Sequence, residues 1–479
     1  MLEYFTDRAE RGEPKQKYQK GFLSQRARII EHLIGGRQSV LEWGCASGRL
    51  LAKLSARERM GRDFCEPMIQ RARDMHEGVD FEVCDIMSSV EPGGKTYEAI
   101  VMDYLAPYVP DIQAALENAL NDARSDTRLI LTSLNAIYAP LLGLLNKIGL
   151  CEPISEMNWL SRPDLRNLLE LSGWEVISVR SEQLFPFEVP LISNLCNRWL
   201  ARLPIIRHLC VSIVFVARPA HSSDLNPNPS CSVIVPARNE AGNISVALER
   251  IPQMGTWTEV IFVEGNSKDN TWATIESEVA RYEGPLKLSY LKQPGIGKWD
   301  AVRAGFAQAK GDLLVIQDAD LTAPPEDLPK FYQAIVSGSA EFANGSRLVY
   351  PMEKGAMRFL NLLGNKFFAE ALSLVLGQRI KDSLCGTKMV SRHDFERLID
   401  LVEKKMGDFD PFGDFNLLFG AALYHLRIRD IPVRYADRTY GDTNISRFRH
   451  GAILFKMTWK GLGSLFFYPL CKRKKRGTK

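Results

Sequence analysis

The chain has 479 residues, of which 45% are hydrophobic and 25% are charged, a composition that is ordinary for folded globular protein and excludes a disordered chain. Its length allows about three domains, or two large α/β domains. The formal net charge is +4, but the last eight residues hold six basic groups and no acid, which leaves 4 − 6 = −2 for the rest. Because the basicity belongs to a tail and not to a folded face, we expect no nucleic-acid partner.

Cysteine usage and hydropathy indicate the compartment. None of the nine cysteines forms a C-x-x-C pair and their number is odd, which favours reduced thiols over disulfides or a zinc site. The polar, charged N-terminal stretch does not predict a signal peptide, and no run reaches the ~18 apolar residues of a spanning helix. We therefore expect a cytoplasmic protein.

The first predicted element is a strand that runs into a glycine turn. Residues 40–51 read VLEWGCASGRLL, with the acidic Glu42 at the end of an apolar strand. Gly44 and Gly48 allow the backbone to approach a ligand closely, and we expect a helix to begin directly after them.

Further predicted strands follow this turn in order. Three of them end in or near an acidic residue, namely Asp63, Asp85 and Asp103. The two oxygens of a carboxylate such as Asp63 bind a ribose diol well. Later strands are predicted at residues 129–134, 174–179 and 211–216.

This series resembles the class I S-adenosylmethionine-dependent methyltransferases over roughly residues 20–218. The first motif of that family is E/D-x-G-x-G-x-G, and Ala46 replaces its middle glycine here. The resemblance implies a doubly wound sheet that binds S-adenosylmethionine, with Asp63 at the ribose and Asp85 at the adenine. The implied cofactor-binding residues are Glu42, Gly44, Gly48, Asp63, Asp85 and Asp103. Because a glycine fingerprint alone is weak, another dinucleotide-type domain, or one that binds nothing, stays an alternative. Methyl transfer to oxygen usually needs a general base, and no histidine has an obvious acceptor-facing position, so methyltransferase activity is a separate question from the fold.

A linker is predicted at residues 219–230, PAHSSDLNPNPS, because the stretch has no periodicity and is rich in Pro, Ser and Asn. It separates a domain at residues 1–218 from a second one at residues 231–450, with an amphipathic helix and basic tail at residues 451–479.

The second domain begins with strands predicted at residues 232–235 and 259–264, the latter ending in Glu264. After the segment PGIGKWDAVRAG at residues 294–305, a buried strand leads directly into Asp318 and Asp320, one residue apart. Two carboxylates at the end of a strand are able to hold a divalent ion beside a diphosphate, whose departure needs positive charge.

These motifs, in this order, resemble family 2 glycosyltransferases of the GT-A fold, in the branch that transfers mannose or glucose to polyprenyl phosphates. The resemblance implies a nucleotide-sugar donor and Mg²⁺ or Mn²⁺, with Asp318 and Asp320 holding the sugar and the metal. Glu264, where the family usually has aspartate, would bind the base or ribose. The other implied donor-binding residues are Pro236, Ala237, Glu240, Lys298 and Arg303.

Later signals extend the same resemblance. Arg347 follows an apolar strand and is predicted to bind substrate, and residues 382–388 correspond to the loop on the acceptor side. Asp414 falls where relatives carry a catalytic base for a hydroxyl acceptor, whereas a phosphate acceptor would need no base and would leave Asp414 a structural role. Arg438 and Arg447 are predicted to bind diphosphate or lipid phosphate, or else to belong to a basic loop that caps the sheet.

An amphipathic helix is predicted near the C-terminal end from residues spaced alternately by four and three: Phe448, Ala452, Phe455, Trp459, Leu462 and Phe466. Such a helix beside a polybasic tail suits an anionic membrane, but the same stripe would also suit packing on the domain.

The sequence as a whole predicts a bifunctional enzyme at the inner face of the cell membrane. One domain would transfer a sugar, with inversion, from a nucleotide-sugar to a polyprenyl phosphate or glycan, and the other would methylate a glycan or related intermediate. One alternative makes the N-terminal domain a binding or scaffolding module without turnover. A second alternative is a non-catalytic assembly protein of the membrane surface.

Overall fold

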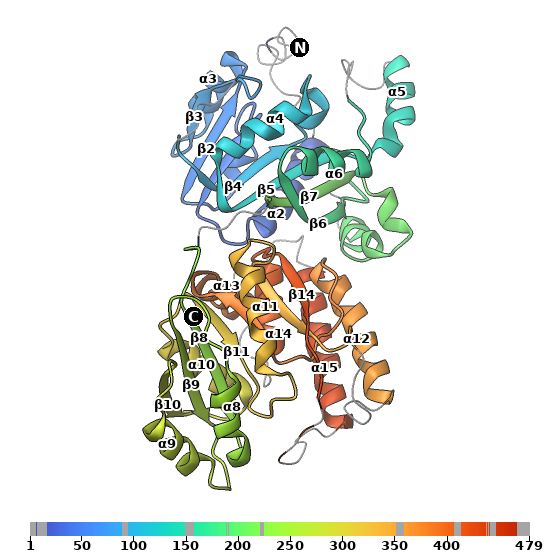
Figure 1. The fold of residues 1–479 in the computed structure, drawn as a ribbon. Helices are drawn as coiled ribbons and strands as arrows, with labels where there is room; N and C mark the ends of the chain where they lie inside the picture. The colour runs from blue at the N-terminus through green and yellow to red at the C-terminus, as the bar shows by residue number, and fades with distance from the viewer. Residues whose placement is uncertain are drawn as a thin grey trace, which may run out of the picture. The chain divides into compact units, whose positions relative to one another are not determined.

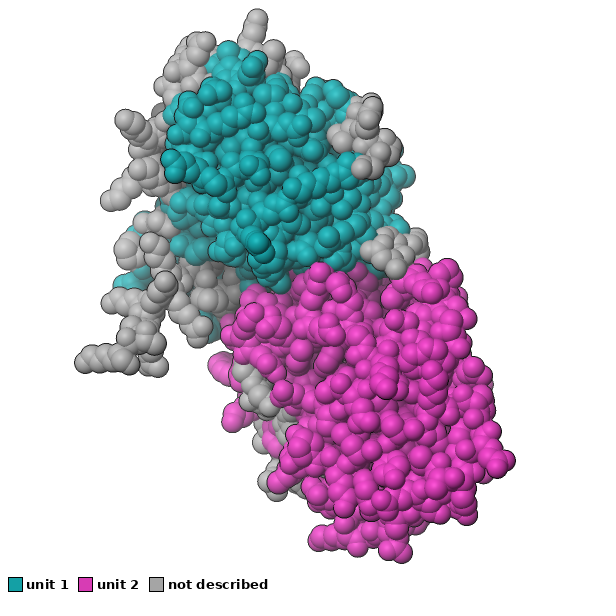
Figure 2. All heavy atoms as spheres, turned by 90° about the vertical axis from the view of Figure 1, so that its left-hand side faces the viewer, with its two compact units in different colours: residues 1–222, 467–479 teal, residues 223–466 magenta. Residues whose placement is uncertain are grey.

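The computed structural model describes residues 6, 17–88, 94–148, 158–187, 189, 191–220, 225–350, 359–406, 413–436, 438, 440 and 447–466. The chain divides into two compact units, one within residues 1–222 and the other at Ser223–Phe466 (Figure 2). In its described part, each unit is built on one seven-stranded sheet.

The sheet of the first unit has the strand order β3-β2-β1-β4-β5-β7-β6 (Figure 1). All neighbours run parallel except β7, which is antiparallel to both β5 and β6. The strand order therefore reverses between β1 and β4, and ligands of such sheets bind outside the carboxyl ends of the strands at this point. The strands are β1 Ser39–Trp43, β2 Glu58–Asp63, β3 Asp80–Val83, β4 Tyr97–Asp103, β5 Ala123–Leu134, β6 Trp174–Glu182 and β7 Ser212–Pro219.

Helices cover both faces of this sheet because successive strand residues point to opposite sides. Val40 joins a core with α2 and α3, whereas Leu41 joins a separate core with α4 and α6. The α-helices are α2 Lys17–Ile34, α3 Glu66–Met75, α4 Ile112–Ala119, α5 Ala139–Lys147, α6 Arg162–Leu171 and α7 Ile192–Asn194. Short helical turns are η1 Leu51–Lys53, η2 Ala106–Tyr108, η3 Leu120–Asp122, η4 Ala136–Tyr138, η5 Leu195–Trp199, η6 Leu200–Arg202 and η7 Ile206–Leu209.

The helix predicted directly after Gly48 is not formed in this fully described stretch. Only the three-residue turn η1 follows, and Leu54 is already extended. The chain then enters β2 at Glu58 without forming an α-helix. The glycine turn at residues 44–48 is therefore not followed by the N-terminus of an α-helix. What the turn provides for a ligand is close approach to the backbone.

The sheet of the second unit has the order β10-β9-β8-β11-β13-β12-β14. Strand β13 is antiparallel to β11 and β12, and the other pairs are parallel. The strands are β8 Cys231–Ala237, β9 Thr258–Glu264, β10 Lys287–Lys292, β11 Leu313–Ile316, β12 Phe342–Ser346, β13 Lys388–Ser391 and β14 Ile428–Pro432.

Two helical layers enclose the second sheet. Helices α8 and α11 pack on one face, and α10, α12, α13, α14 and α15 contribute to the core on the other. The helices are α8 Ile244–Arg250, α9 Thr271–Arg281, α10 Lys298–Gln308, α11 Leu328–Val336, α12 Phe359–Leu376, α13 Arg392–Met406, α14 Asp414–Leu423 and α15 Arg447–Gly461, with short turns η8 Ala241–Asn243, η9 Pro325–Asp327 and η10 Leu462–Phe466. All ten residues of α14 are buried, so its first residue, Asp414, is held firmly.

The predicted C-terminal helix is present as α15 and η10, and the predicted apolar stripe is divided between core and surface. Leu454, Met457 and Leu465 are buried in the core, and Leu462 of the stripe packs against it, whereas Phe455 and Trp459 of the stripe are exposed. The side chains of Phe448 and Ala452 lie outside the described part. The helix therefore packs on its unit and also presents aromatic side chains outward. The basic tail lies outside the described residues, and none of the helices described here is long and apolar enough to cross a membrane.

Candidate functional site

The acidic residues predicted for the second unit gather at one edge of its sheet. Strands β8, β9 and β11 are parallel, so the segments that follow them leave from the same edge. At each exit the backbone turns through a left-handed conformation, at Asn239 (φ 57°), Asn266 (φ 58°) and Leu321 (φ 53°). Non-glycine residues adopt this conformation rarely, and here it redirects the chain around the candidate site.

Asp318 forms an ion pair with Lys298, the first residue of α10, with 2.6 Å between Nζ and Oδ1. Burial by itself lowers the pKa of Lys298, but the charges of Asp318, Asp414 and Asp320 outweigh it and raise the pKa above its usual value. The pKa of Asp318 is lowered because Lys298 outweighs the opposing effect of burial. A Cβ atom on Gly386 would collide with both partners, so the loop at residues 382–388 closes tightly over this pair.

Asp320 is bound by Arg438 through a 2.6 Å contact between Oδ2 and Nη2. The same guanidinium lies 3.3 Å from Oε1 of Glu240, and the hydroxyl of Thr322 donates to Oδ1 of Asp320 at 2.9 Å. Burial raises the pKa of Glu240, while Arg438 and Asn243 oppose that shift. One arginine thus bridges a residue that follows β8 and a residue that follows β11.

The two carboxylates after β11 fit a divalent ion that shares its coordination with substrate. The described residues contain no group of three or more His, Cys, Asp or Glu side chains able to hold a metal. Mg²⁺ typically takes one or two carboxylates and completes its shell with water and substrate phosphates. Asp318 and Asp320 supply that minimum, and a diphosphate would supply the remaining oxygens.

Asp414 lies at the start of α14, close to the same charges. Gly413 precedes it with φ 84°, and a Cβ atom there would approach the Trp299 ring to 2.6 Å. Oδ1 of Asp414 has no hydrogen-bond partner within the described part of the chain but lies 3.5 Å from Nζ of Lys388. Lys388 is only 1% exposed, and the sequence analysis missed it as a functional residue although it ends the predicted acceptor-side loop.

Arg347, predicted to bind substrate, forms an ion pair with the buried carboxylate of Asp382. Its Nε and Nη2 atoms donate to Asp382 at 2.8 and 2.9 Å, and its backbone N–H donates to the same carboxylate at 3.0 Å. Arg347 overcomes the effect of burial and lowers the pKa of Asp382 to about 2. The pair fixes the exit of β12 against the loop at residues 382–388.

Arg303 is not brought to the carboxylates. It points from α10 toward α13, where its Nη2 lies 3.3 Å from Oε1 of Glu403, and both side chains are nearly half exposed. Lys298 and Arg303 are five positions apart, which places them on different faces of a helix with 3.6 residues per turn.

We expect Lys298→Met to lower sugar transfer by roughly 10²–10³-fold, because it removes a preorganised cation beside the reacting groups. Arg303→Ala should change the rate by less than about twofold, since exposed ion pairs contribute little. Initial rates at saturating donor test both variants, and equal losses would contradict this placement of the two side chains.

The remaining predicted donor residues lie at the ends of β8 and β9. Pro236 and Ala237 end β8. Glu264 ends β9, is buried, and accepts the N–H of Ser267 through Oε1 at 2.5 Å. For Arg447 the structure gives only its place at the start of α15, and its side chain lies outside the described part.

In the first unit, Glu42 lies at the switch point between β1 and β4. It is 3% exposed, and its Oε2 has no hydrogen-bond partner among the described residues. Burial, followed by the charge of Asp103, raises its pKa well above the usual range. A buried acceptor without a donor is costly, so Glu42 fits a ligand that brings a donor or a positive charge.

The glycine turn has the conformation that its motif requires, even with alanine in the middle. Gly44, Ala46 and Gly48 have φ values of 73°, 46° and 69°. The N–H of Ala46 donates to Oδ2 of Asp63 at 2.8 Å, and the N–H of Cys65 donates to Oδ1 at 2.9 Å. Asp63 therefore braces the turn and retains lone pairs for a further donor.

Asp85 and Asp103 differ in their surroundings. Asp85 is exposed and accepts the N–H of Met87 at 2.9 Å. Asp103 ends β4, where it pairs with Arg26 at 2.6 Å and accepts the hydroxyl of Thr132 at 2.7 Å. Asp103 is thus committed to protein partners, whereas Asp85 is open to solvent.

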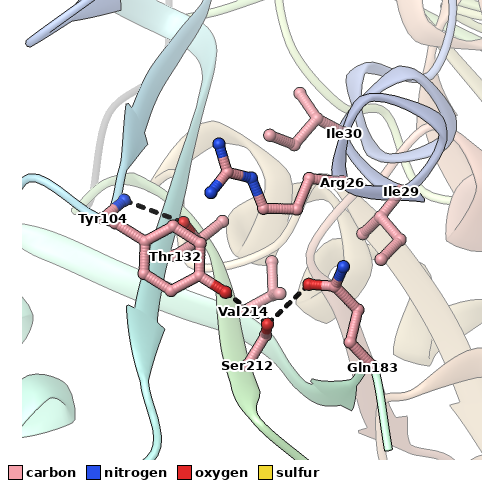
Figure 3. A pocket seen from close by; sticks show the side chains of 8 residues that line it. All are labelled: Arg26, Ile29, Ile30, Tyr104, Thr132, Gln183, Ser212 and Val214. Carbon is pink, nitrogen blue, oxygen red and sulfur yellow. Dashed lines mark hydrogen bonds between the residues drawn. The ribbon is translucent and has the colours of Figure 1, made fainter. Parts of the chain in front are cut away.

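A small cleft next to Asp103 contains residues that the sequence analysis did not identify (Figure 3). The guanidinium of Arg26 lies 4.8 Å from the centre of the Tyr104 ring. The Tyr104 hydroxyl bonds to Ser212, whose hydroxyl donates to Gln183 at 2.7 Å. Burial raises the pKa of Tyr104 above its usual value. Only the position of Tyr104 directly after the acid of β4 could have indicated it, because the other partners come from distant segments.

Comparison with known families agrees with this division of the chain. Residues 232–399 match the family model for glycosyl transferase family 2, and residues 10–179 match a methyltransferase domain model. The chain therefore joins a segment that matches a methyltransferase domain to a segment that matches glycosyl transferase family 2, in the order that the sequence predicted.

Among curated proteins, the second unit is similar to two transferases. An undecaprenyl-phosphate 4-deoxy-4-formamido-L-arabinose transferase of Serratia proteamaculans is 27% identical over 47% of this chain and 65% of its own length. A dolichol-phosphate mannosyltransferase of Pyrococcus furiosus is 39% identical over 48% of this chain and 64% of its own length. The chain thus spans less than two thirds of either relative.

Among solved structures, the first unit is similar to a SAM-dependent methyltransferase, possible histamine N-methyltransferase, from Thermotoga maritima. The two are 17% identical with a TM-score of 0.32, covering 42% of this chain and 93% of that one.

Proposed function

We propose that the protein transfers a sugar, with inversion, from a nucleotide-sugar to a polyprenyl phosphate, and that its first unit binds S-adenosylmethionine to methylate a glycan or related intermediate. The two activities are assigned to residues 231–450 and 1–218, joined by residues 219–230. The observation that carries the proposal is the meeting of Asp318 and Asp320 with Lys298 and Arg438 at the carboxyl edge of the second sheet.

Sugar transfer needs positive charge where the nucleoside diphosphate leaves. Lys298 and Arg438 are already held at that place by the carboxylates, so little reorganisation is needed when phosphate oxygens arrive. Asp318 and Asp320 would hold a Mg²⁺ or Mn²⁺, which would supply further positive charge to the leaving diphosphate. The guanidinium of Arg438 would bind phosphate oxygens, a role that suits its planar set of donors.

The surroundings of Asp414 favour a phosphate acceptor over a hydroxyl. A hydroxyl nucleophile needs a base, but Asp414 already neutralises the buried Lys388 at 3.5 Å. A phosphate is anionic before it attacks, so no proton has to be removed. Both curated relatives are named for polyprenyl-phosphate acceptors, which supports the same choice; a glycan acceptor would instead require Asp414 as the base.

Ligand-induced stabilisation tests the donor site. A ligand at 100 times its dissociation constant adds about 2.7 kcal/mol to the free energy of unfolding, so binding would be visible in thermal unfolding of the full chain. We expect stabilisation by sugar nucleotides of one base with Mn²⁺, and its loss in Asp320→Asn. Equal stabilisation of wild type and variant would contradict a role for Asp320 in donor binding.

The first unit offers a smaller set of residues for its cofactor. The Oε2 atom of Glu42 suits the amino group of S-adenosylmethionine, the turn at residues 44–48 permits close approach, and Asp63 retains acceptor capacity for the ribose. The bound cofactor would supply an electrophilic methyl group. The Tyr104–Ser212–Gln183 hydrogen bonds would line the acceptor side.

We expect Glu42→Gln to leave the unliganded protein as stable as wild type or more so, because it removes a buried carboxylate whose ionised form burial disfavours. The same change should abolish most of the stabilisation by S-adenosylmethionine. Thermal unfolding with and without the cofactor measures both effects, and Glu77→Gln, an exposed change in the same unit, is the control. Full retention of the cofactor effect would contradict the role of Glu42.

A binding module without turnover is the second candidate for the first unit. The shortened turn after Gly48 favours it. If the protein transferred a labelled methyl group from the cofactor to extracted lipid or glycan, a binding module without turnover would be excluded.

We further place the protein in the cytoplasm, peripheral at the inner face of the membrane. The exposed aromatic residues Phe455 and Trp459 of α15 support that placement.

A further inference from the structure

The first unit carries two insertions that leave the same edge of its sheet. One follows β5 and contains η4 and α5, and the other lies between β6 and β7 and contains α7 to η7. Strands β5 and β6 are both antiparallel to β7, so their carboxyl ends share an edge. The insertions are joined there, because Asn135 donates to the carbonyls of His208 and Cys210 at 2.8 and 2.9 Å and the Tyr138 hydroxyl donates to Leu209 at 2.5 Å. Figure 1 shows both on the same flank of the unit.

These insertions concentrate exposed apolar side chains. Of the sixteen exposed large hydrophobic residues in the described part of the first unit, thirteen lie at residues 137–148 and 187–209, a surface that we name the apolar flank. Leu191 and Ile205 are each 85% exposed, and Leu144 is 56% exposed. The other three, Met75, Val83 and Leu171, lie on separate elements. Scattered exposed apolar residues are normal in a folded protein, but a gathered set marks an interaction surface.

The apolar flank carries an excess of positive charge. By sequence, residues 137–148 and 187–209 contain Lys147, Arg198, Arg202 and Arg207 against one acid, Glu188, which gives a formal net charge of 4 − 1 = +3. Arg202 is neutralised by Glu182 at 2.7 Å. The surface is therefore apolar and cationic at once.

An anionic lipid surface complements this combination. Apolar side chains enter the boundary between headgroups and acyl chains, and cations meet the anionic headgroups. A second copy of the chain fits less well, because a two-fold interface places the same patch on both sides and would bring like charges together. From the apolar exposure and the charge, we propose that the apolar flank docks the first unit on the surface of an anionic bilayer.

Docking in this way would direct the methyltransferase-like site toward the lipid. Gln183 begins the second insertion and Ser212 follows it, and both line the cleft of Figure 3. In this pose the cleft would be within reach of acceptors that are carried by lipid.

Partition of the full chain onto vesicles tests the proposal. With vesicles of phosphatidylcholine and phosphatidylglycerol, we expect Leu144→Glu/Ile205→Glu to lower the partition coefficient by more than about tenfold, since two apolar side chains no longer insert. Both residues are exposed, so the fold should persist. The matched control is Leu171→Glu. The Leu171 side chain is 60% exposed, but it lies at the end of α6, just before β6 begins, and therefore at the edge of the sheet opposite to the apolar flank. Equal partition of both variants would overturn the proposal.

Hydrogen exchange of the wild-type chain separates the apolar flank from the C-terminal region, which could also bind lipid. We expect vesicles to slow exchange at residues 137–148 and 187–209. Protection by vesicles only at residues 447–466 would overturn the proposal. It would also be overturned if vesicles gave the flank no protection and the wild-type chain formed a dimer that the variant Leu144→Glu/Ile205→Glu dissociates. No donor or cofactor is present, so failure here leaves the proposed sugar transfer untouched.

Discussion

Replacing Asp320 with asparagine should reduce sugar transfer by roughly 10²–10³-fold or more, the loss seen when one preorganised charge at a reacting centre is removed. Asp320 organises Arg438, Thr322 and, through Arg438, Glu240. The asparagine would keep the shape of the side chain but could neither neutralise Arg438 nor hold a divalent ion firmly. Single-turnover rates at saturating donor and metal measure the effect on the chemical step.

The control for this variant is Asp400→Asn, which removes an exposed carboxylate of α13 that pairs with Lys404 one turn along the same helix. We expect its rate to stay within about twofold of wild type, because such pairs contribute little. If Asp320→Asn retained the wild-type rate while the control behaved as expected, the carboxylates after β11 would not belong to the reaction centre.

Asp382→Asn should be the most destabilising single change in the second unit. It leaves Arg347 buried without its counter-charge, and breaking a buried pair in this way costs about 3–5 kcal/mol. That loss lowers the melting temperature by roughly 6–20 °C for a domain of this size. Thermal unfolding of the full chain measures this change in melting temperature from the transition of the second unit, with Asp400→Asn as the control. A shift no larger than that of the control would contradict a structural role for the Arg347–Asp382 pair.

The pH dependence of this effect has a defined sign. The pKa of Asp382 is lowered from 3.8 to about 2, so its charge stabilises the fold above the unfolded pKa, and the stabilisation is lost as pH falls through the folded one. The stability difference between wild type and Asp382→Asn should shrink by about 2 kcal/mol between pH 5 and pH 2. Denaturant titrations over that range check it, and a constant difference would point to a cause other than charge.

The sequence predicted the acidic site residues because several strands run directly into a carboxylate. Glu42, Glu264 and Asp318 each lie at the end of a short apolar run, and parallel strands bring such ends to one edge. Local pattern was enough for these residues. The motif alone also predicted a helix after Gly48, and this was wrong because only the three-residue turn η1 forms before β2.

Side-chain partners could not be read from the sequence, because they depend on segments far apart along the chain. Arg347 and Asp382 are 35 positions apart, and Arg438 and Asp320 are 118 apart. Both arginines were predicted to bind substrate, yet Arg347 pairs with a buried carboxylate and Arg438 bridges the candidate site. The distance along the chain between partners also explains why Lys388 was missed, and why the packing of α15 through Leu454 and Met457, with Phe455 and Trp459 exposed, could not be predicted.

The most direct test of the central claim is transfer of labelled sugar from UDP- and GDP-sugars to a polyprenyl phosphate by the full chain with Mn²⁺. We predict that label enters the organic phase from donors of one base, that the anomeric configuration inverts, and that Asp320→Asn abolishes the product. Label that stays in water with every donor, while the same preparation still binds S-adenosylmethionine, would contradict the assignment of sugar transfer to the second unit.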